Sequence, residues 1–288
     1  MYLIRNAEWL APLVRRIDVE APRVAQHHQP GHFVIVRVDE EGERIPLTIA
    51  SSDADSGLIT LVVQVVGATT ERLCNLEAGE HIANIAGPMG KPTEIENYGL
   101  AILVGGGVGT AVINPQAKAL KDAGCTVLAI IGGRSKEYVI FEKELSEYCQ
   151  EVYPCTDDGS YGYNGFVTGK LQEVLEANPG RVGVVLTAGP VPMMKAVAGV
   201  TQPAGVRTIV SLNPIMVDGT GMCGGCRVSI DGKMKFACVD GPEFDAHQVD
   251  FAELTDRLTT YRAQEKEAWD RLHEKKQCCC DQAKKKEQ

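Results

Sequence analysis

The sequence predicts an antiparallel β-barrel domain followed by a parallel-sheet α/β domain, and three observations support this order. Residues 1–98 are rich in β-branched residues, in short segments without long helical patterns between them, which is typical of an antiparallel barrel or sandwich. In residues 99–212, apolar runs alternate with helical stretches, which indicates a parallel sheet covered by helices. Cysteines then cluster within residues 213–250, and residues 251–288 have helical spacing.

Local patterns predict the individual elements. The expected strands lie at residues 31–38, 58–66, 100–104, 126–131, 182–186 and 206–212, and the expected helices at 111–123 and 141–149. Asp231-Gly232 predicts a short hairpin. From Phe251 onward, apolar residues recur at roughly 3.5-residue spacing, which predicts one amphipathic helix. We expect a disordered, exposed tail after it, and an additional metal or redox site at Cys278, Cys279 and Cys280 is the alternative.

Composition narrows the class of function. The net charge of −9 argues against nucleic acid, which attracts basic surfaces. No apolar run approaches the roughly 20 residues of a membrane span, and no signal peptide is recognisable, so we expect a cytoplasmic protein without a membrane partner. Ten cysteines in such a chain favour a metal site over disulfides.

The candidate metal ligands cluster in and after a glycine-rich loop. Asp218, Cys223, Cys226 and Cys238 have the spacing Asp-x4-Cys-x2-Cys-x11-Cys. In the plant-type 2Fe–2S pattern, Cys-x4-Cys-x2-Cys with a distant fourth Cys, Asp218 occupies the first position. A zinc site and unliganded buried thiols are the alternatives for the cysteines. Asp218 is predicted to be a ligand, and a loop-capping role is the alternative.

A second glycine-rich segment predicts a phosphate site. The strand at residues 100–104 runs into Gly105, Gly107, Gly109 and Thr110, and a helix follows, so unpaired N–H groups and the helix dipole favour an anion. Arg134, after the next expected strand, is a candidate for a 2′-phosphate contact or a plain surface cation. No acidic residue follows that strand, so the choice between NAD(H) and NADP(H) stays open.

A third turn is expected to face the same crevice. Gly189, Pro190 and Met193 follow the strand at residues 182–186, and ligands of open α/β sheets bind beyond the carboxyl ends of the strands. The alternative is a rigid turn into a helix, with Met193 and Met194 filling the core.

Taken in order, these segments resemble a known family. Residues 44–50, 66–70, 87–92, 104–111 and 189–194, followed by the cysteine loop, resemble the ferredoxin–NADP reductase superfamily over roughly residues 1–250. More narrowly, the chain is similar to the branch that holds the electron-transfer subunit of dihydroorotate dehydrogenase B, the sulfide dehydrogenase small subunit, and the small subunit of NADH-dependent reduced ferredoxin:NADP oxidoreductase.

The resemblance implies an FAD site in the barrel. It places Thr48 beside the flavin N5, with Pro46 and Leu47 along the isoalloxazine. The superfamily's Arg-x-Tyr-Ser is replaced by Ile45-Pro46-Leu47-Thr48, so tyrosine stacking is absent and Arg44, one place early, is the candidate for a phosphate contact. The other cofactor contacts that it implies are Val66, Gly67, Thr69, Thr70, Gly87, Met89 and Gly90.

The resemblance also implies a function. Asp218 with three cysteines is similar to the ferredoxin:NADP oxidoreductase and sulfide dehydrogenase type, whereas the dihydroorotate dehydrogenase subunit typically uses four cysteines. The implied protein is an oxidoreductase subunit that carries FAD and a 2Fe–2S cluster, binds NAD(H), and pairs with a larger iron–sulfur flavoprotein. That complex uses ferredoxin and performs flavin-based electron bifurcation. Cys155 and Asp157-Asp158 then border the nicotinamide pocket or form a turn. A redox-sensing subunit without turnover and a zinc-stabilised nucleotide-binding regulator are the rival hypotheses.

Overall fold

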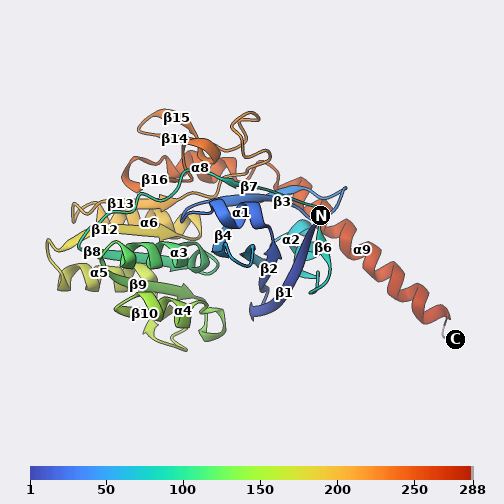
Figure 1. The fold of residues 1–288 in the computed structure, drawn as a ribbon, viewed down its shortest axis with the longest axis horizontal. Helices are drawn as coiled ribbons and strands as arrows, with labels where there is room; N and C mark the ends of the chain where they lie inside the picture. The colour runs from blue at the N-terminus through green and yellow to red at the C-terminus, as the bar shows by residue number, and fades with distance from the viewer. Residues whose placement is uncertain (287–288) are drawn as a thin grey trace.

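The chain forms two seven-stranded sheets that lie side by side, with a cysteine-containing segment above them and a long C-terminal helix that extends away (Figure 1). The structure is a computed structural model that describes residues 1–286, with side chains described for residues 1–274. Within the described residues, none of the helices combines the length and the apolar character that a membrane span requires.

The first sheet is antiparallel and curled, as predicted. Its strand order is β6-β1-β2-β5-β4-β3-β7, and its two end strands are separated in the chain only by Ala83, so the sheet must curl to bring its edges together. Ile17, Ile49 and Leu61 point into the barrel and are fully buried. The elements of this part are β1 (Tyr2–Ala11), β2 (Val14–Glu20), α1 (Pro22–His27), β3 (Phe33–Arg37), β4 (Arg44–Asp53), β5 (Leu58–Gln64), α2 (Ala68–Cys74), β6 (His81–Ile82) and β7 (Asn84–Met89).

The second sheet is parallel except at one edge, which confirms the predicted α/β part. Its order is β11-β10-β9-β8-β12-β13-β16, and only β16 runs antiparallel, against β13. Ala101, Leu103 and Ala129 are buried under α3. The elements are β8 (Leu100–Gly106), α3 (Gly109–Asp122), β9 (Thr126–Gly133), η1 (Lys136–Tyr138), α4 (Glu142–Tyr148), β10 (Glu151–Thr156), β11 (Tyr163–Asn164), α5 (Val167–Ala177), β12 (Val182–Ala188), α6 (Val191–Thr201), β13 (Thr208–Ser211) and β16 (Glu243–Asp245).

The segment between β13 and β16 carries the cysteine loop. Its hairpin turns at Asp231-Gly232, as predicted, between β14 (Arg227–Ile230) and β15 (Lys233–Phe236). The short helix α7 (Ala237–Asp240) follows, and η2 (Ala246–Gln248) comes after β16.

The prediction of a single C-terminal helix from Phe251 onward is wrong. Residues from Phe251 onward form two helices, α8 (Phe251–Arg257) and α9 (Arg262–Lys286). The hydroxyls of Thr259 and Thr260 donate to the carbonyls of Asp256 and Arg257, and such local bonds compete with helix continuation. Among the side chains described for these two helices, buried apolar residues lie only in α8, at Phe251 and Leu254. Cys278, Cys279 and Cys280 lie in α9, and their side chains are outside the described part.

Candidate functional site: a two-domain cavity beside a cysteine loop

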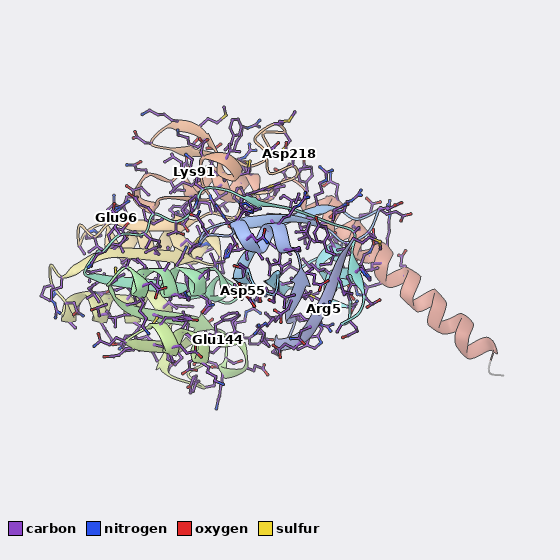
Figure 2. All side chains as sticks on the ribbon, viewed as in Figure 1. Arg5, Asp55, Lys91, Glu96, Glu144 and Asp218 are labelled. Atoms are coloured by element: carbon purple, nitrogen blue, oxygen red, sulfur yellow. The ribbon has the colours of Figure 1, made fainter. Side chains whose placement is uncertain are left out.

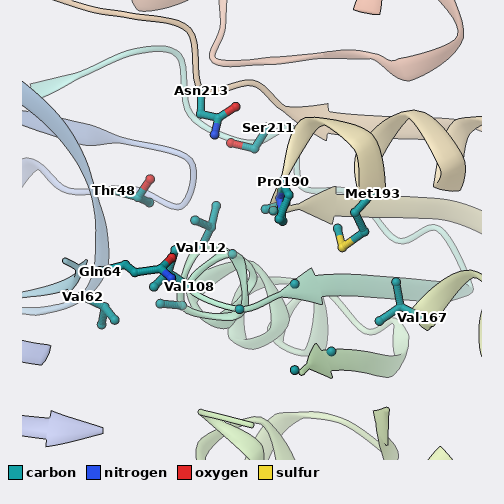
Figure 3. A pocket seen from close by; sticks show the side chains of 18 of the residues that line it. Thr48, Val62, Gln64, Val108, Val112, Val167, Pro190, Met193, Ser211 and Asn213 are labelled. Carbon is teal, nitrogen blue, oxygen red and sulfur yellow. The ribbon is translucent and has the colours of Figure 1, made fainter. Parts of the chain in front are cut away.

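A cavity of about 820 Å³ opens between the two sheets. Figure 3 shows side chains that approach it from the barrel, from the start of α3, from the start of α6 and from the chain after β13. The carboxyl ends of β8, β9, β12 and β13 all border it. This is the position at which open α/β sheets bind their ligands.

The barrel contributes the segment that the resemblance assigned to the flavin. Pro46, Leu47 and Thr48 of β4 line the cavity, and Phe33 of β3, the strand partner of Thr48, lines it beside them. Val62 and Gln64 of β5 also face it, and the sequence analysis missed them. Their signal was available, because residues two apart on a strand share one face.

The turn between β8 and α3 contributes the predicted phosphate loop. Gly107 and Gly109 line the cavity. A Cβ on Gly109 would clash with the carbonyl oxygen of Ala188 and lie 2.7 Å from the Cα of Gly189, so the first turn of α3 packs directly on the end of β12. Gly105 and Thr110 lie behind this surface, where a Cβ on Gly105 would be 2.8 Å from the Cα of Thr110.

Met193 and Met194 divide the two predicted roles between them. Met194 is fully buried, which is the core role, whereas Met193 lines the cavity with Gly189 and Pro190. Figure 3 shows Pro190 and Met193 at the start of α6, facing the cavity.

The remaining predicted flavin contacts lie outside this cavity, and each has a place in the structure. Arg44 is exposed on β4. The Thr70 hydroxyl accepts hydrogen bonds from the N–H groups of Val66 and Gly67, which closes the start of α2. Thr69 donates to Glu43. Gly87, Met89 and Gly90 follow one another at the end of β7.

The prediction that no acidic residue lies near Arg134 is wrong. No acidic residue directly follows β9, but Asp157, which follows the neighbouring strand β10, lines the cavity together with Arg134. Asp158 instead forms a turn by accepting the N–H of Ser160. Hydrogen bonding from the Ser160 side chain first, and then from its backbone, holds the pKa of the Asp158 carboxyl below the usual range. Cys155 is buried, and burial raises the pKa of its thiol to about 12.

Several cavity residues had no signal in the sequence. Ser211 and Asn213 lie on the same side of the cavity as Thr48 in Figure 3, at the end of β13. Met216 reaches the cavity from the cysteine segment. Ser211 and Asn213 have no charged or glycine-rich neighbours in the chain, and the tertiary fold brings all three residues to the cavity. Tyr138 and Phe166 also line the cavity and were not predicted.

The structure brings two of the predicted cluster ligands together. The sulfurs of Cys226 and Cys238 are 3.2 Å apart, and both residues are buried. The backbone N–H of Cys238 points to the sulfur of Cys226 at 3.5 Å, and the N–H of Gly225 points to the sulfur of Cys223 at 3.4 Å. Amide N–H groups directed at cysteine sulfurs are a feature of iron–sulfur sites.

The other two predicted ligands are not gathered with this pair. Cys223 is exposed, and the Asp218 carboxylate accepts the N–H groups of Thr220 and Cys223, at 3.0 Å each. These bonds, that from Thr220 first, hold the pKa of Asp218 below its usual range. Among the described side chains, no three histidine, cysteine or acidic residues converge as they would around one metal ion. Three thiols and a carboxylate in one chain segment nevertheless match the donor chemistry that we predict for a 2Fe–2S cluster.

The cysteine loop packs against the barrel. A Cβ on Gly219, whose φ is +75°, would clash with the sulfur of Met89 and lie 2.9 Å from Ile35 Cγ1. Phe33, Met216, Cys226 and Cys238 belong to one buried apolar cluster. One apolar packing layer therefore connects the cavity with the cysteine pair. Figure 2 shows Asp218 on the side of the molecule away from Glu144 of α4.

This combination of a curled antiparallel sheet, a parallel sheet with a glycine-rich turn and an appended cysteine loop defines a reductase-like electron-transfer protein. Residues 213–250 match the model of the iron–sulfur cluster binding domain of dihydroorotate dehydrogenase B. The Thermotoga maritima dihydroorotate dehydrogenase B (NAD(+)) electron transfer subunit homolog is 47% identical, and the alignment covers 88% of this chain and 89% of that protein. The electron transfer subunit of Geobacillus thermodenitrificans is 33% identical over 83% of this chain and 94% of its own length.

The chain belongs to the family of dihydroorotate dehydrogenase B electron-transfer subunits and their homologues. A chain of the NADH-dependent reduced ferredoxin–NADP oxidoreductase structure, solved to study flavin-based electron bifurcation, superposes with a TM-score of 0.89 at 44% identity. The match covers 94% of this chain and 98% of that one. An Amycolatopsis cytochrome P450 reductase at 21% identity and a TM-score of 0.59 shares the fold alone. The family resemblance read from the sequence is thereby confirmed.

Proposed function

We propose that this chain is the subunit that moves electrons between NAD(H), FAD and one 2Fe–2S cluster in an NADH-dependent reduced ferredoxin–NADP oxidoreductase. The observation that carries the proposal is the single cavity shared by both domains. Thr48 of the barrel and Gly107 of the nucleotide loop line the same space, so a flavin and a nicotinamide held by these segments would meet there. FAD supplies the chemistry that exchanges a hydride with single electrons.

The protein's own residues have separate tasks in this proposal. Pro46, Leu47 and Thr48 would orient the flavin ring, and the Thr48 hydroxyl can hydrogen-bond a ring nitrogen. Gly107 and Gly109, at the N-terminus of α3, would hold the dinucleotide pyrophosphate. Asp218, Cys223, Cys226 and Cys238 would hold the cluster. The apolar layer from Phe33 to Cys226 supports electron passage because it excludes water between the two sites.

The surface around the cysteine loop supports a partner that accepts electrons there. Met222 is 88% exposed, and Val217, Met234 and Val239 are also exposed in the same segment. Large exposed apolar side chains that gather in one region mark interaction surfaces. We assign this surface to the larger iron–sulfur flavoprotein subunit, through which ferredoxin would exchange electrons.

The names of the relatives support a second candidate. An electron-transfer subunit of a dihydroorotate dehydrogenase would use the same cavity and loop with a different partner. The sequence resemblance adds the small subunit of a sulfide dehydrogenase, which would use them in the same way. Reconstitution of the purified chain with each candidate partner, followed by assays with ferredoxin, dihydroorotate or polysulfide, separates these functions.

The cofactor set is tested first on the chain itself. After anaerobic purification, we expect about one flavin and two irons per chain and an S = 1/2 EPR signal on reduction. Cys226→Ala should remove the iron and the EPR signal and retain the flavin. Cys149→Ala, which replaces a buried cysteine far from the loop, is the matched control and should retain both. Zinc in place of iron would refute the electron-transfer proposal.

A further inference from the structure

We propose that Arg257 of α8 supplies a fixed positive charge beside the 2Fe–2S cluster and thereby raises the reduction potential of the cluster. The inference rests on the proposed function, because it assumes that the cysteine loop holds this cluster. It gives a role in electron transfer to a residue beyond the matched iron–sulfur domain, which ends at residue 250.

The fold fixes α8 beside the cysteine loop. Figure 1 shows α8 next to β14, the strand that begins directly after Cys226. The backbone N–H of Asp250, which caps α8, donates to the carbonyl of Ser229 on β14 at 3.0 Å. Leu254 belongs to the same buried apolar cluster as Cys226 and Cys238. α8 therefore holds a defined position relative to this cysteine pair.

From the last turn of α8, Arg257 reaches the loop between two predicted cluster ligands. Its Nη2 donates to the carbonyl of Gly225 at 3.1 Å, and Gly225 lies between Cys223 and Cys226 in the chain. The N–H of Gly225 points in turn to the sulfur of Cys223 at 3.4 Å. Arg257 therefore binds the residue whose own amide faces a predicted ligand.

The described side chains do not neutralise this guanidinium. Among residues 1–274, Arg257 takes part in no ion pair, and its Nε is buried without a hydrogen-bond partner. A buried donor of this kind calls for an explanation, and an anionic group in the adjacent loop fits it. Because arginine stays protonated at all ordinary pH values, the positive charge is permanent.

Other charged side chains near Arg257 also keep their charges. Glu253 and Asp256, on the same helix, offset part of its field, and Arg227, directly after Cys226, adds to it. In the described part of the chain, no hydrogen bond joins the side chain of any of these three residues to the loop, whereas that of Arg257 is held on the loop by a hydrogen bond. The contribution of Arg257 is therefore the one whose distance from the loop is fixed.

A cation at this place favours the reduced state of the cluster. One-electron reduction adds one negative charge to the cluster and breaks no bond, so the guanidinium stabilises the reduced form more than the oxidised form. The potentials of iron–sulfur clusters depend on the charges and hydrogen bonds around them.

The test is a redox titration of the anaerobically purified, cofactor-loaded full chain with dithionite and mediators, in which the S = 1/2 EPR signal measures the reduced cluster. At the wild-type midpoint potential, Arg257→Gln should lower the ratio of reduced to oxidised cluster by about three- to tenfold, and tenfold corresponds to about 59 mV for one electron. Arg257→Lys keeps the charge and should retain most of the ratio. Arg262→Gln, at an exposed arginine where α9 begins, is the control and should leave it unchanged.

The outcomes separate the inference from the proposed function. If Arg257→Gln retains its iron and has the wild-type midpoint potential, the inference is overturned and the proposed function stands. If Arg257→Gln loses the cluster, Arg257→Lys decides: retention there shows that the positive charge stabilises the cluster, whereas loss there makes Arg257 a structural clamp and overturns the inference. A wild-type chain without iron would overturn the proposed function and this inference with it.

Discussion

Glu243 should make the stability of this protein fall as the pH rises. Its Oε1 accepts hydrogen bonds from the Thr93 hydroxyl, at 2.7 Å, and from the Gln116 amide, at 2.5 Å. Thr93 lies in the chain between the two sheets, Gln116 lies on α3, and Glu243 begins β16. The carboxyl thus joins three parts of the fold beneath the cavity. Burial raises its pKa from 4.5 to about 7, although the two hydrogen bonds act in the opposite direction.

The sign follows from proton uptake. Between the unfolded pKa of 4.5 and the folded pKa of about 7, the unfolded chain releases this proton while the folded chain retains it. The contribution to stability is therefore complete below 4.5 and is lost as the pH rises through 7. Since each tenfold change in proton affinity is worth about 1.4 kcal/mol, the loss reaches about 3 kcal/mol.

Glu243→Gln isolates this effect, because glutamine offers the same acceptor oxygen without a charge. For a chain of this size, about 3 kcal/mol corresponds to roughly 6 °C in Tm. We expect the variant to match the wild type near about pH 5 and to melt roughly 6 °C higher near about pH 8. Thermal unfolding of both cofactor-loaded proteins across this range measures the difference. Glu40→Gln, at an exposed site, is the control. A Tm difference for Glu243→Gln that is flat with pH, or that falls, would refute the reasoning.

Three further predictions follow from the site. Gly109→Ala should destabilise the protein by about 1–3 kcal/mol and weaken NAD+ binding, because the new Cβ would clash with the end of β12. The control is Gly199→Ala in α6, where a Cβ would meet no other atom. That change should stabilise the protein by about 0.5–1 kcal/mol in the same Tm assay. Asp218→Cys should retain the cluster and shift its EPR spectrum, whereas the hairpin control Asp231→Asn should not; an unchanged Asp218→Cys spectrum would make Asp218 a loop cap only. Met222→Asn should lower the affinity for the larger subunit in a pull-down without changing NADH-driven dye reduction, whereas Trp9→Asn, at another exposed apolar residue, should change neither.

Local patterns were sufficient for most of the fold. Strand and helix periods predicted β8, α3, β9 and β12 within a few residues, because each element buries one face or both in a regular way. The C-terminal helix was predicted as one element because apolar spacing continues past Leu258. Whether a helix continues depends on where its apolar face finds a partner. Phe251, Leu254 and Leu258 pack on the core, whereas the described side chains of α9 are half-buried or exposed.

The site was predictable where backbone geometry demands a residue type. Gly107 and Gly109 belong to the predicted phosphate turn, and Gly109 packs on the end of β12, so the sequence carries their signal. Asp157 carries no comparable signal, because it reaches Arg134 only through the pairing of β9 with β10. The predicted cluster ligands lie between these two cases in how far the sequence indicates them. Their spacing predicts the loop, but the contact of Cys226 with Cys238 depends on the hairpin between them.

The place of the cysteine segment in the topology explains how the chain can serve both sites. The segment is a long connection between β13 and β16, which pair antiparallel at the sheet edge. Both of its ends reach the cavity: Ser211 and Asn213 enter from β13, and Pro242 lies just before β16. Its middle packs on the barrel through Gly219. Because the segment is anchored at both ends and in the middle, its cysteines are held at a defined position beside the cavity, and a change at its tip, such as Met222→Asn, leaves these anchors intact. Partner choice can therefore diverge at the exposed loop while the two redox sites keep their relative geometry.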